Sequence, residues 1–105
     1  MLTKMTAEEA ALRAELDRAV RRVEREVRRC PALDELPYRP SAEAAAAVEN
    51  TNCALKDAEQ VVDLLERLTN TTQEAVRLVA CARLGIATIR EVLTMLCAEL
   101  DARAA

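Results

Sequence analysis

The chain has 105 residues, with 15 basic and 18 acidic side chains and a formal net charge of −3. This length predicts a single helical domain over residues 1–105, and the acidic balance excludes a general electrostatic attraction to nucleic acid. Histidine is absent, so the commonest general base and metal ligand is missing. Since the single glycine also leaves no phosphate-binding loop, the chain is expected to be no enzyme and to hold no cofactor or metal.

The composition predicts an all-α fold. The chain has 21 alanines, one tyrosine, three prolines and neither phenylalanine nor tryptophan. Turn residues are few and apolar residues never alternate at period two, which excludes a sheet. An alanine-rich core buries little apolar area, and at roughly 25 cal/mol per Å² it stabilises an isolated domain weakly. We therefore expect a three-helix bundle or helical hairpin with coiled-coil-type heptad packing, completed by another chain.

The first helix is predicted over about residues 7–30. Thr6 and Glu9 have the spacing of an N-terminal capping box, and Pro31 ends the helix. Its heptad stripe, expected to be buried, contains Leu16, Val20, Val23, Val27 and Cys30.

A basic stripe lies on the opposite face of this helix, formed by Arg18, Arg21, Arg22, Arg25, Arg28 and Arg29. Acidic residues one turn away predict a solvated face stabilised by ion pairs. The alternative is a docking face for an acidic partner, with Arg18, Arg22, Arg25 and Arg29 as candidate contacts. Nucleic acid is disfavoured because no aromatic residues interleave with the arginines.

Residues 31–40 contain three prolines and predict an extended linker, with the ring of Tyr38 covering a helix end. The same segment could serve as a docking peptide. A second helix is predicted over about residues 42–68, with Ser41 as its N-cap. Its heptad stripe consists of Ala44, Val48, Thr51, Leu55, Ala58, Val62 and Leu65. The polar Thr51 is expected to accept a hydrogen bond across helices or to set their register.

The third helix is predicted over about residues 72–103. Thr71 and Glu74 form a second capping box, so the chain is expected to turn at residues 69–72 and to form an antiparallel hairpin. The heptad register nevertheless continues in phase through this joint. One uninterrupted helix over residues 42–103, roughly 93 Å long at 1.5 Å per residue, is the alternative.

This last segment is apolar nearly all round. Between Gln73 and Leu100, 18 of 28 residues are apolar and six are charged. Gly85 in its interior is expected to permit a close helix crossing, and Arg83 and Arg90 exclude a membrane span. One heptad face matches the stripes of the other helices. The unmatched flank is the candidate partner-binding site, and it contains Leu78, Cys81, Leu84, Val92 and Met95.

The four cysteines, at positions 30, 53, 81 and 97, show no metal-binding spacing. We expect them to be free, buried thiols in a reducing compartment, and no targeting segment is recognised near the first residues. These features predict an intracellular, cytoplasmic protein.

Together these patterns predict a non-enzymatic structural or adaptor subunit that assembles through helix–helix packing, as a homo- or hetero-oligomer. Small subunits of cytoskeletal, ciliary or scaffold assemblies have this general character, although no diagnostic motif is present. No small-molecule substrate is expected. The alternative is a small regulatory module that docks its arginine-rich face on an acidic protein or nucleic-acid surface.

Overall fold

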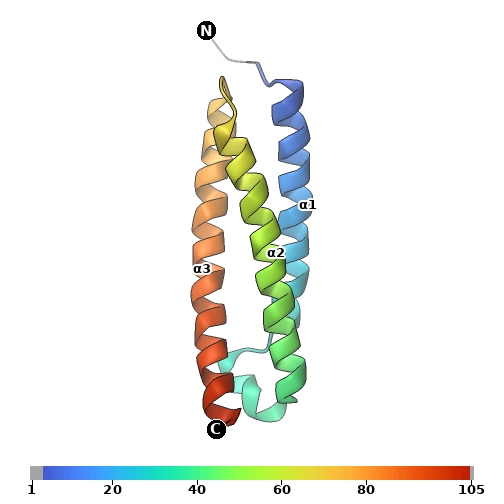
Figure 1. The fold of residues 1–105 in the computed structure, drawn as a ribbon, viewed down its shortest axis with the longest axis vertical. Coiled ribbons are helices and arrows are strands. Elements are labelled where there is room, and N and C mark those ends of the chain that lie inside the picture. The colour runs from blue at the N-terminus through green and yellow to red at the C-terminus, as the bar shows by residue number, and fades with distance from the viewer. Residues whose placement is uncertain (1–3, 105) are drawn as a thin grey trace.

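Three long helices lie side by side in a computed structural model that describes residues 4–104, with side chains to residue 103 (Figure 1). The elements are α1 (Ala7–Arg29), the short 3₁₀ helix η1 (Leu33–Tyr38), α2 (Ser41–Arg67) and α3 (Gln73–Ala104). The described residues contain helices and no strand, which confirms the all-α class. Neighbouring helices in the sequence run antiparallel, so α1 and α3 point the same way along a rod of 58 × 17 × 17 Å.

The start of α1 confirms Thr6 as N-cap, since its hydroxyl accepts a hydrogen bond from the Glu9 N–H at 3.1 Å. The helix ends at Arg29, one residue earlier than expected, because Pro31 pushes Cys30 into an extended conformation.

The linker differs from its prediction. Residues Leu33–Tyr38 form a 3₁₀ helix and not an extended segment. Leu36 is its buried residue, at 3% exposure, whereas the ring of Tyr38 is 87% exposed and covers no helix end. At three residues per turn, a side chain two residues after Leu36 points away from the side that Leu36 buries.

The second helix begins one residue earlier than expected, and Ser41 is not its N-cap. Pro40 occupies that position with an extended ψ of 129°, and no side chain caps the helix. The Pro40 carbonyl accepts the first helical hydrogen bond, from the Ala44 N–H at 3.1 Å. The helix ends at Arg67.

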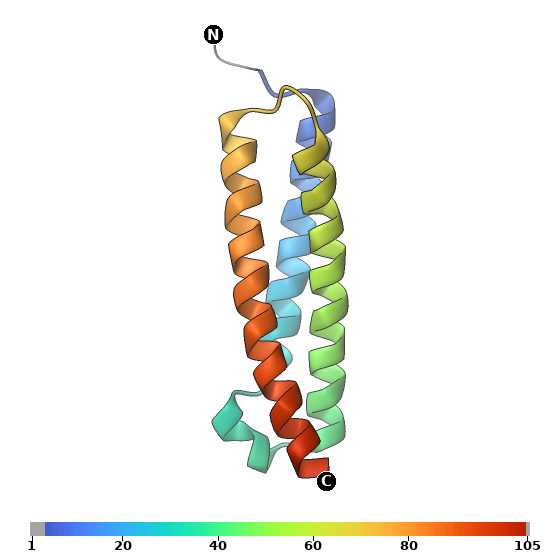
Figure 2. The same ribbon diagram turned by 60° about the vertical axis from the view of Figure 1, so that its left-hand side comes forward.

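The predicted break before α3 is confirmed, and the alternative of one continuous helix is wrong (Figure 2). Asn70 adopts a φ of 58° in the turn, a left-handed conformation that asparagine tolerates better than most residues. The cap, however, is Thr72 and not Thr71. The Thr72 hydroxyl accepts from the Ala75 N–H at 3.2 Å, so α3 begins at Gln73.

The core is centred on α2, which packs against both α1 and α3. Every residue of its predicted heptad stripe is buried, including Leu55 and Thr51 at 0% exposure. The Thr51 hydroxyl donates to the Ala47 carbonyl at 2.8 Å and lies 3.2 Å from the Cys30 sulfur of the α1–η1 junction. The expected hydrogen bond across helices is therefore present, and this buried hydroxyl is satisfied.

Ion pairs flank the outer edges of both α2 interfaces. Arg22 of α1 pairs with Asp57, and Arg90 of α3 pairs with Glu59. Arg83 contacts Glu66 at 3.1 Å and Asp63 at 2.8 Å, and these hydrogen bonds raise the pKa of its guanidinium above the ordinary value. Since all these side chains are partly exposed, the pairs set the register of the helices more than they stabilise them.

Truncating the core of α2 should cost far more than truncating its surface. We expect Leu55→Ala to lower the free energy of unfolding by about 3 kcal/mol, because the fully buried side chain leaves a cavity. The matched control is Leu64→Ala on the same helix, where the side chain is 48% exposed, and its expected cost is below about 1 kcal/mol. Urea unfolding followed by circular dichroism measures both, and equal losses would contradict the central position of α2.

Candidate functional site

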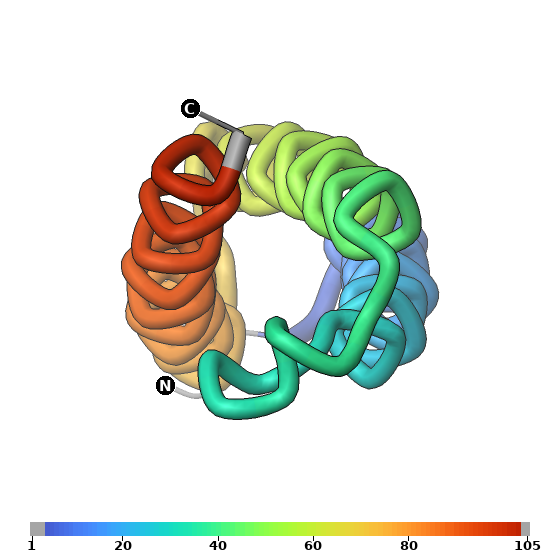
Figure 3. Tube along the Cα trace, turned by 90° about the horizontal axis from the view of Figure 1, so that it is seen from below, coloured from blue at the N-terminus to red at the C-terminus, as the bar shows by residue number. Residues whose placement is uncertain are grey.

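An apolar groove separates α1 from α3. Both helices pack on α2 but make few contacts with each other. In the view along the rod, α3 lies at the left and α1 at the right, with α2 above and between them (Figure 3). The groove has a volume of about 670 Å³, and Leu55 and Ala58 of α2 form its floor. Its walls are formed on α1 by Arg13, Ala14, Leu16, Asp17, Val20, Val23 and Glu24, and on α3 by Leu78, Cys81, Ala82, Gly85, Ile86 and Ile89.

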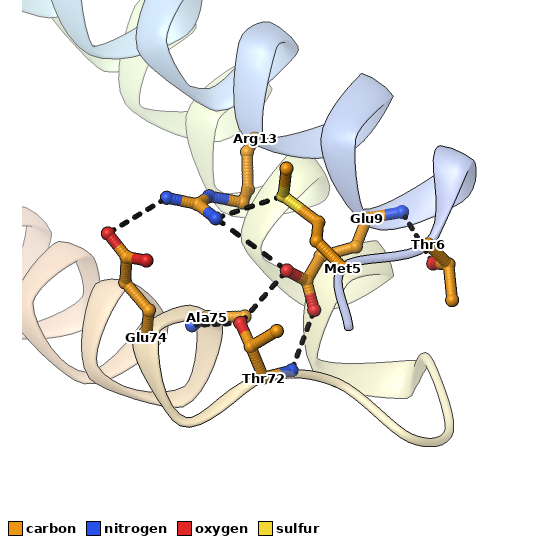
Figure 4. A network of polar contacts seen from close by, with 7 residues as sticks. All are labelled: Met5, Thr6, Glu9, Arg13, Thr72, Glu74 and Ala75. Atoms are coloured by element: carbon orange, nitrogen blue, oxygen red, sulfur yellow. Dashed lines mark hydrogen bonds and ion pairs between the residues drawn. The ribbon is translucent and has the colours of Figure 1, made fainter. Parts of the chain in front are cut away.

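One end of the groove is bridged by the carboxylate of Glu9, which is 1% exposed (Figure 4). It accepts a hydrogen bond from the Thr72 N–H at 2.8 Å and another from the Thr72 hydroxyl at 2.9 Å. Arg13, one turn further along α1, lies 3.7 Å from Glu9 and 3.1 Å from Glu74. These contacts hold the first turn of α1 to the start of α3. In the capping box predicted at Thr6, the Glu9 carboxylate would accept from the Thr6 N–H, but it accepts from Thr72 instead.

The other end of the groove is occupied by η1. Figure 3 shows this segment between the ends of α1 and α3, where Leu36 joins the hydrophobic core. The groove is therefore the stretch between two spacers, the Glu9–Thr72 contact and η1. Neither spacer reaches the middle of α1 or α3.

The groove walls correct two expectations. Val20 was expected in the buried stripe of the first helix but is 36% exposed, because no helix faces it across the groove. Gly85 was expected to permit a close crossing, yet a Cβ built on it would meet nothing within 4 Å. Ala82 and Ile89, which share the heptad register of the buried Ile86 and Leu93 on α3, are only partly buried for the same reason.

The predicted partner-binding flank lies along the α3 wall of this groove. Leu78 and Cys81 line the groove directly. The other members lie beside them and are exposed: Leu84 at 71%, Val92 at 50% and Met95 at 54%. Their role in binding stays a prediction. The sequence analysis did not predict that α1 forms the other wall of the groove. A heptad repeat identifies Val20 as apolar, but it does not tell whether another helix packs against it.

The cysteines are all free, as expected, but none of the four is fully buried, so the prediction of buried thiols is wrong. Cys53 and Cys81 are exposed, and Cys30 and Cys97 are partly buried. Cys53 lies two residues from both Thr51 and Leu55 of the buried heptad stripe of α2, and Cys81 lies on the groove wall.

The arginine face of α1 is only partly available. Arg22 is engaged by Asp57 of α2, and Arg29 lies 3.7 Å from Glu26 on its own helix. Arg18 and Arg25 are exposed on the outer side of α1. Their roles as partner contacts also stay predictions.

Over residues 4–103, no group of three or more cysteine or acidic side chains is placed to hold a metal ion. None of the helices in the described part of the chain combines the length and the hydropathy needed to traverse a lipid bilayer. No protein-family model, curated protein or solved structure matches the chain. The function must therefore be argued from the groove and its walls.

Removing the Glu9 carboxylate should loosen the end of the groove. We expect Glu9→Ala to lower the free energy of unfolding by about 2 kcal/mol, because it leaves the Thr72 N–H and hydroxyl without their acceptor. Glu8→Ala is the matched control, since Glu8 is an exposed acid in the same helical turn, and its cost should stay within about 0.5 kcal/mol. Denaturant unfolding compares the two, and hydrogen exchange should report faster exchange at the start of α3 in Glu9→Ala alone.

Proposed function

We propose that the chain is a non-enzymatic structural or adaptor subunit whose groove receives a helix from another polypeptide, completing a four-helix bundle with coiled-coil-type packing. The observation that carries this proposal is the apolar groove of about 670 Å³ between two helices that share only α2 as a neighbour. Apolar walls left in water favour association, since each Å² buried stabilises a complex by roughly 25 cal/mol.

The directions of the three helices also support a helical occupant. Since α1 and α3 are parallel to each other and antiparallel to α2, a helix running in the direction of α2 would be antiparallel to both walls. This is the alternation found in antiparallel four-helix bundles, where helices pack 8–10 Å apart. The scaffold or cytoskeletal setting and the cytoplasmic location belong to the same proposal, and four free thiols agree with a reducing compartment.

The alternative function, docking of the arginine face on an acidic or nucleic-acid surface, has less support. Arg22 and Arg29 are already paired within the chain, which leaves fewer side chains for a partner. Changing Arg18 and Arg25 together to glutamate would test that face separately.

A charge placed on the exposed flank of α3 tests the proposal. We expect Cys81→Glu to abolish the assembly that the tagged chain forms in its source cell, because Cys81 lines the groove and the carboxylate would be buried against an apolar neighbour. The matched control is Val76→Glu, which places the same charge about 140° around the helix from Cys81, at a residue that is 60% exposed and does not line the groove. Quantitative mass spectrometry of the purified assemblies, with their masses measured by light scattering, compares the two variants.

Both variants should keep the helix content and melting temperature of the wild type, since both side chains are exposed. Assembly that survives Cys81→Glu, or that is lost equally in Val76→Glu, would contradict a function based on the groove side of α3.

A further inference from the structure

We propose that the chain exchanges α3 with a second copy, so that the α2–α3 hairpin opens into one continuous helix and two such helices pair antiparallel. In this exchanged dimer, α3 of each copy packs on α2 of the other through the contacts that it makes within a single chain. The inference goes beyond the proposed function, because it uses the α2–α3 interface and leaves the groove open. It is carried by the heptad phase across the turn and by the conformation of the turn.

The buried rows of α2 and α3 share one heptad phase, although a turn separates the two helices. Counting in sevens, every step reaches a buried or half-buried residue: Ala44, Thr51, Ala58, Leu65, Thr72, Val79, Ile86, Leu93 and Leu100. A second row has the same property and consists of Ala47, Ala54, Val61, Leu68, Ala75, Ala82, Ile89 and Leu96. Together the two rows alternate steps of three and four residues, which is the pattern of a long coiled coil.

A hairpin does not require this relation between its two helices. The turn reorients the second helix, so the phase of its buried row is set independently of the first. One residue more or fewer in the turn would leave both apolar faces intact but would remove the common phase. In a continuous helix, by contrast, the common phase keeps both rows on one side. The sequence therefore suits the open form as well as the closed one.

The turn itself contains no residue that forbids a helix. Residues 68–72 include neither proline nor glycine. Asn70 is held at a φ of 58°, a left-handed conformation that is disfavoured for residues with a side chain. Short hinges under strain are the segments that promote exchange of an element between copies. Opening the hairpin returns Asn70 to a helical φ and adds helical hydrogen bonds across the joint.

The Glu9 carboxylate opposes this opening. It accepts a hydrogen bond from the Thr72 N–H at 2.8 Å, and this N–H is available because α3 begins at the next residue. In a continuous helix the same N–H would donate to the Leu68 carbonyl, four residues earlier. The backbone half of the Glu9–Thr72 contact therefore exists only in the closed hairpin, where Glu9 acts as a latch.

Exchange preserves the interface between α2 and α3. Arg83 contacts Asp63 and Glu66 in the closed form, and α3 of a second copy brings an identical arginine to the same acids. The buried side chains likewise meet identical neighbours. The difference in free energy between the two forms therefore comes from the joints, the latches and the association itself. High protein concentration and any change that relaxes the joint favour the dimer.

Complementary charge reversals test the exchange directly. One variant carries Arg83→Glu, and the other carries Asp63→Arg and Glu66→Arg, so each places like charges across its own α2–α3 interface. After the two full-length chains are unfolded together and refolded, we expect the heterodimer to exceed either homodimer by at least about tenfold, because exchange restores opposite charges at both interfaces. Native mass spectrometry measures the ratio. Separate monomers, or dimers in statistical proportion, would overturn the inference.

The length of the dimer distinguishes exchange from pairing along the groove. One helix from Ser41 to Ala104 extends over about 96 Å at 1.5 Å per residue, whereas the closed rod is 58 Å long. Small-angle X-ray scattering should therefore give the heterodimer a maximum dimension of at least about 96 Å. A dimer as short as the closed rod would indicate side-by-side pairing and overturn the inference.

Two substitutions at the exposed Asn70 test the joint. Alanine is disfavoured at a φ of 58° and is the best helix former, so Asn70→Ala should raise the dimer association constant by roughly a hundredfold, tenfold for each joint. Asn70→Gly is the matched control and should stay monomeric, because glycine adopts this φ freely and weakens a helix. Sedimentation equilibrium after refolding compares the two. Equal association constants would count against the exchange.

The latch and the groove are tested with variants already described. Glu9→Ala should raise the dimer association constant by about tenfold, whereas Glu8→Ala should not change it. An unchanged dimer in Glu9→Ala would contradict the latch. Cys81→Glu should leave the exchange intact, since Cys81 lies on the groove wall. An exchanged dimer without any Cys81-dependent assembly in cells therefore supports this inference and removes the proposed function, and the reverse result does the opposite.

Discussion

The arrangement of the molecule depends on one buried carboxylate. Glu9 in the first turn of α1 accepts two hydrogen bonds from Thr72, 63 residues later, and these bonds, with the Arg13–Glu74 ion pair, join α1 to the start of α3. A buried carboxylate is destabilising unless it is hydrogen-bonded and paired. Glu9 meets both conditions, because Thr72 supplies two donors and Arg13 supplies a positive charge. The contact therefore has one geometry, and it sets the height of α1 relative to α3.

This contact helps to explain why a groove remains between α1 and α3. The Glu9–Thr72 contact at one end and η1 at the other keep α1 and α3 apart, while both pack on α2. The alanines of α2, including Ala54 and Ala58 at 0% and 1% exposure, let its neighbours approach closely. The small side chain of Ala58 on the floor of the groove does not fill the space between the walls. The open groove thus follows from a small-residue core combined with fixed spacers at both ends.

Sequence periodicity predicted those parts of the fold in which every apolar stripe has a neighbour. The α2 stripe was correct at each position because helices cover α2 on both sides, from Ala44 to Leu65. The same periodicity wrongly predicted that Val20 is buried and that Gly85 lies at a close helix crossing. A heptad repeat identifies an apolar face but does not tell whether a helix lies opposite it. It also assigned Glu9 to its own helix end, because local spacing carries no information about a partner 63 residues away. The flank of α3 was predictable, whereas the α1 wall required the structure.

The apolar character of α3 now divides into three parts with different physical causes. One row packs on α2, a second lines the groove, and a third lies exposed beside it, from Leu84 to Met95. Arg83 and Arg90 do not interrupt any of these rows, because they turn to the acids of α2 on the opposite edge. The helix therefore keeps these two arginines off the groove side, where Leu78 and Cys81 line the α3 wall.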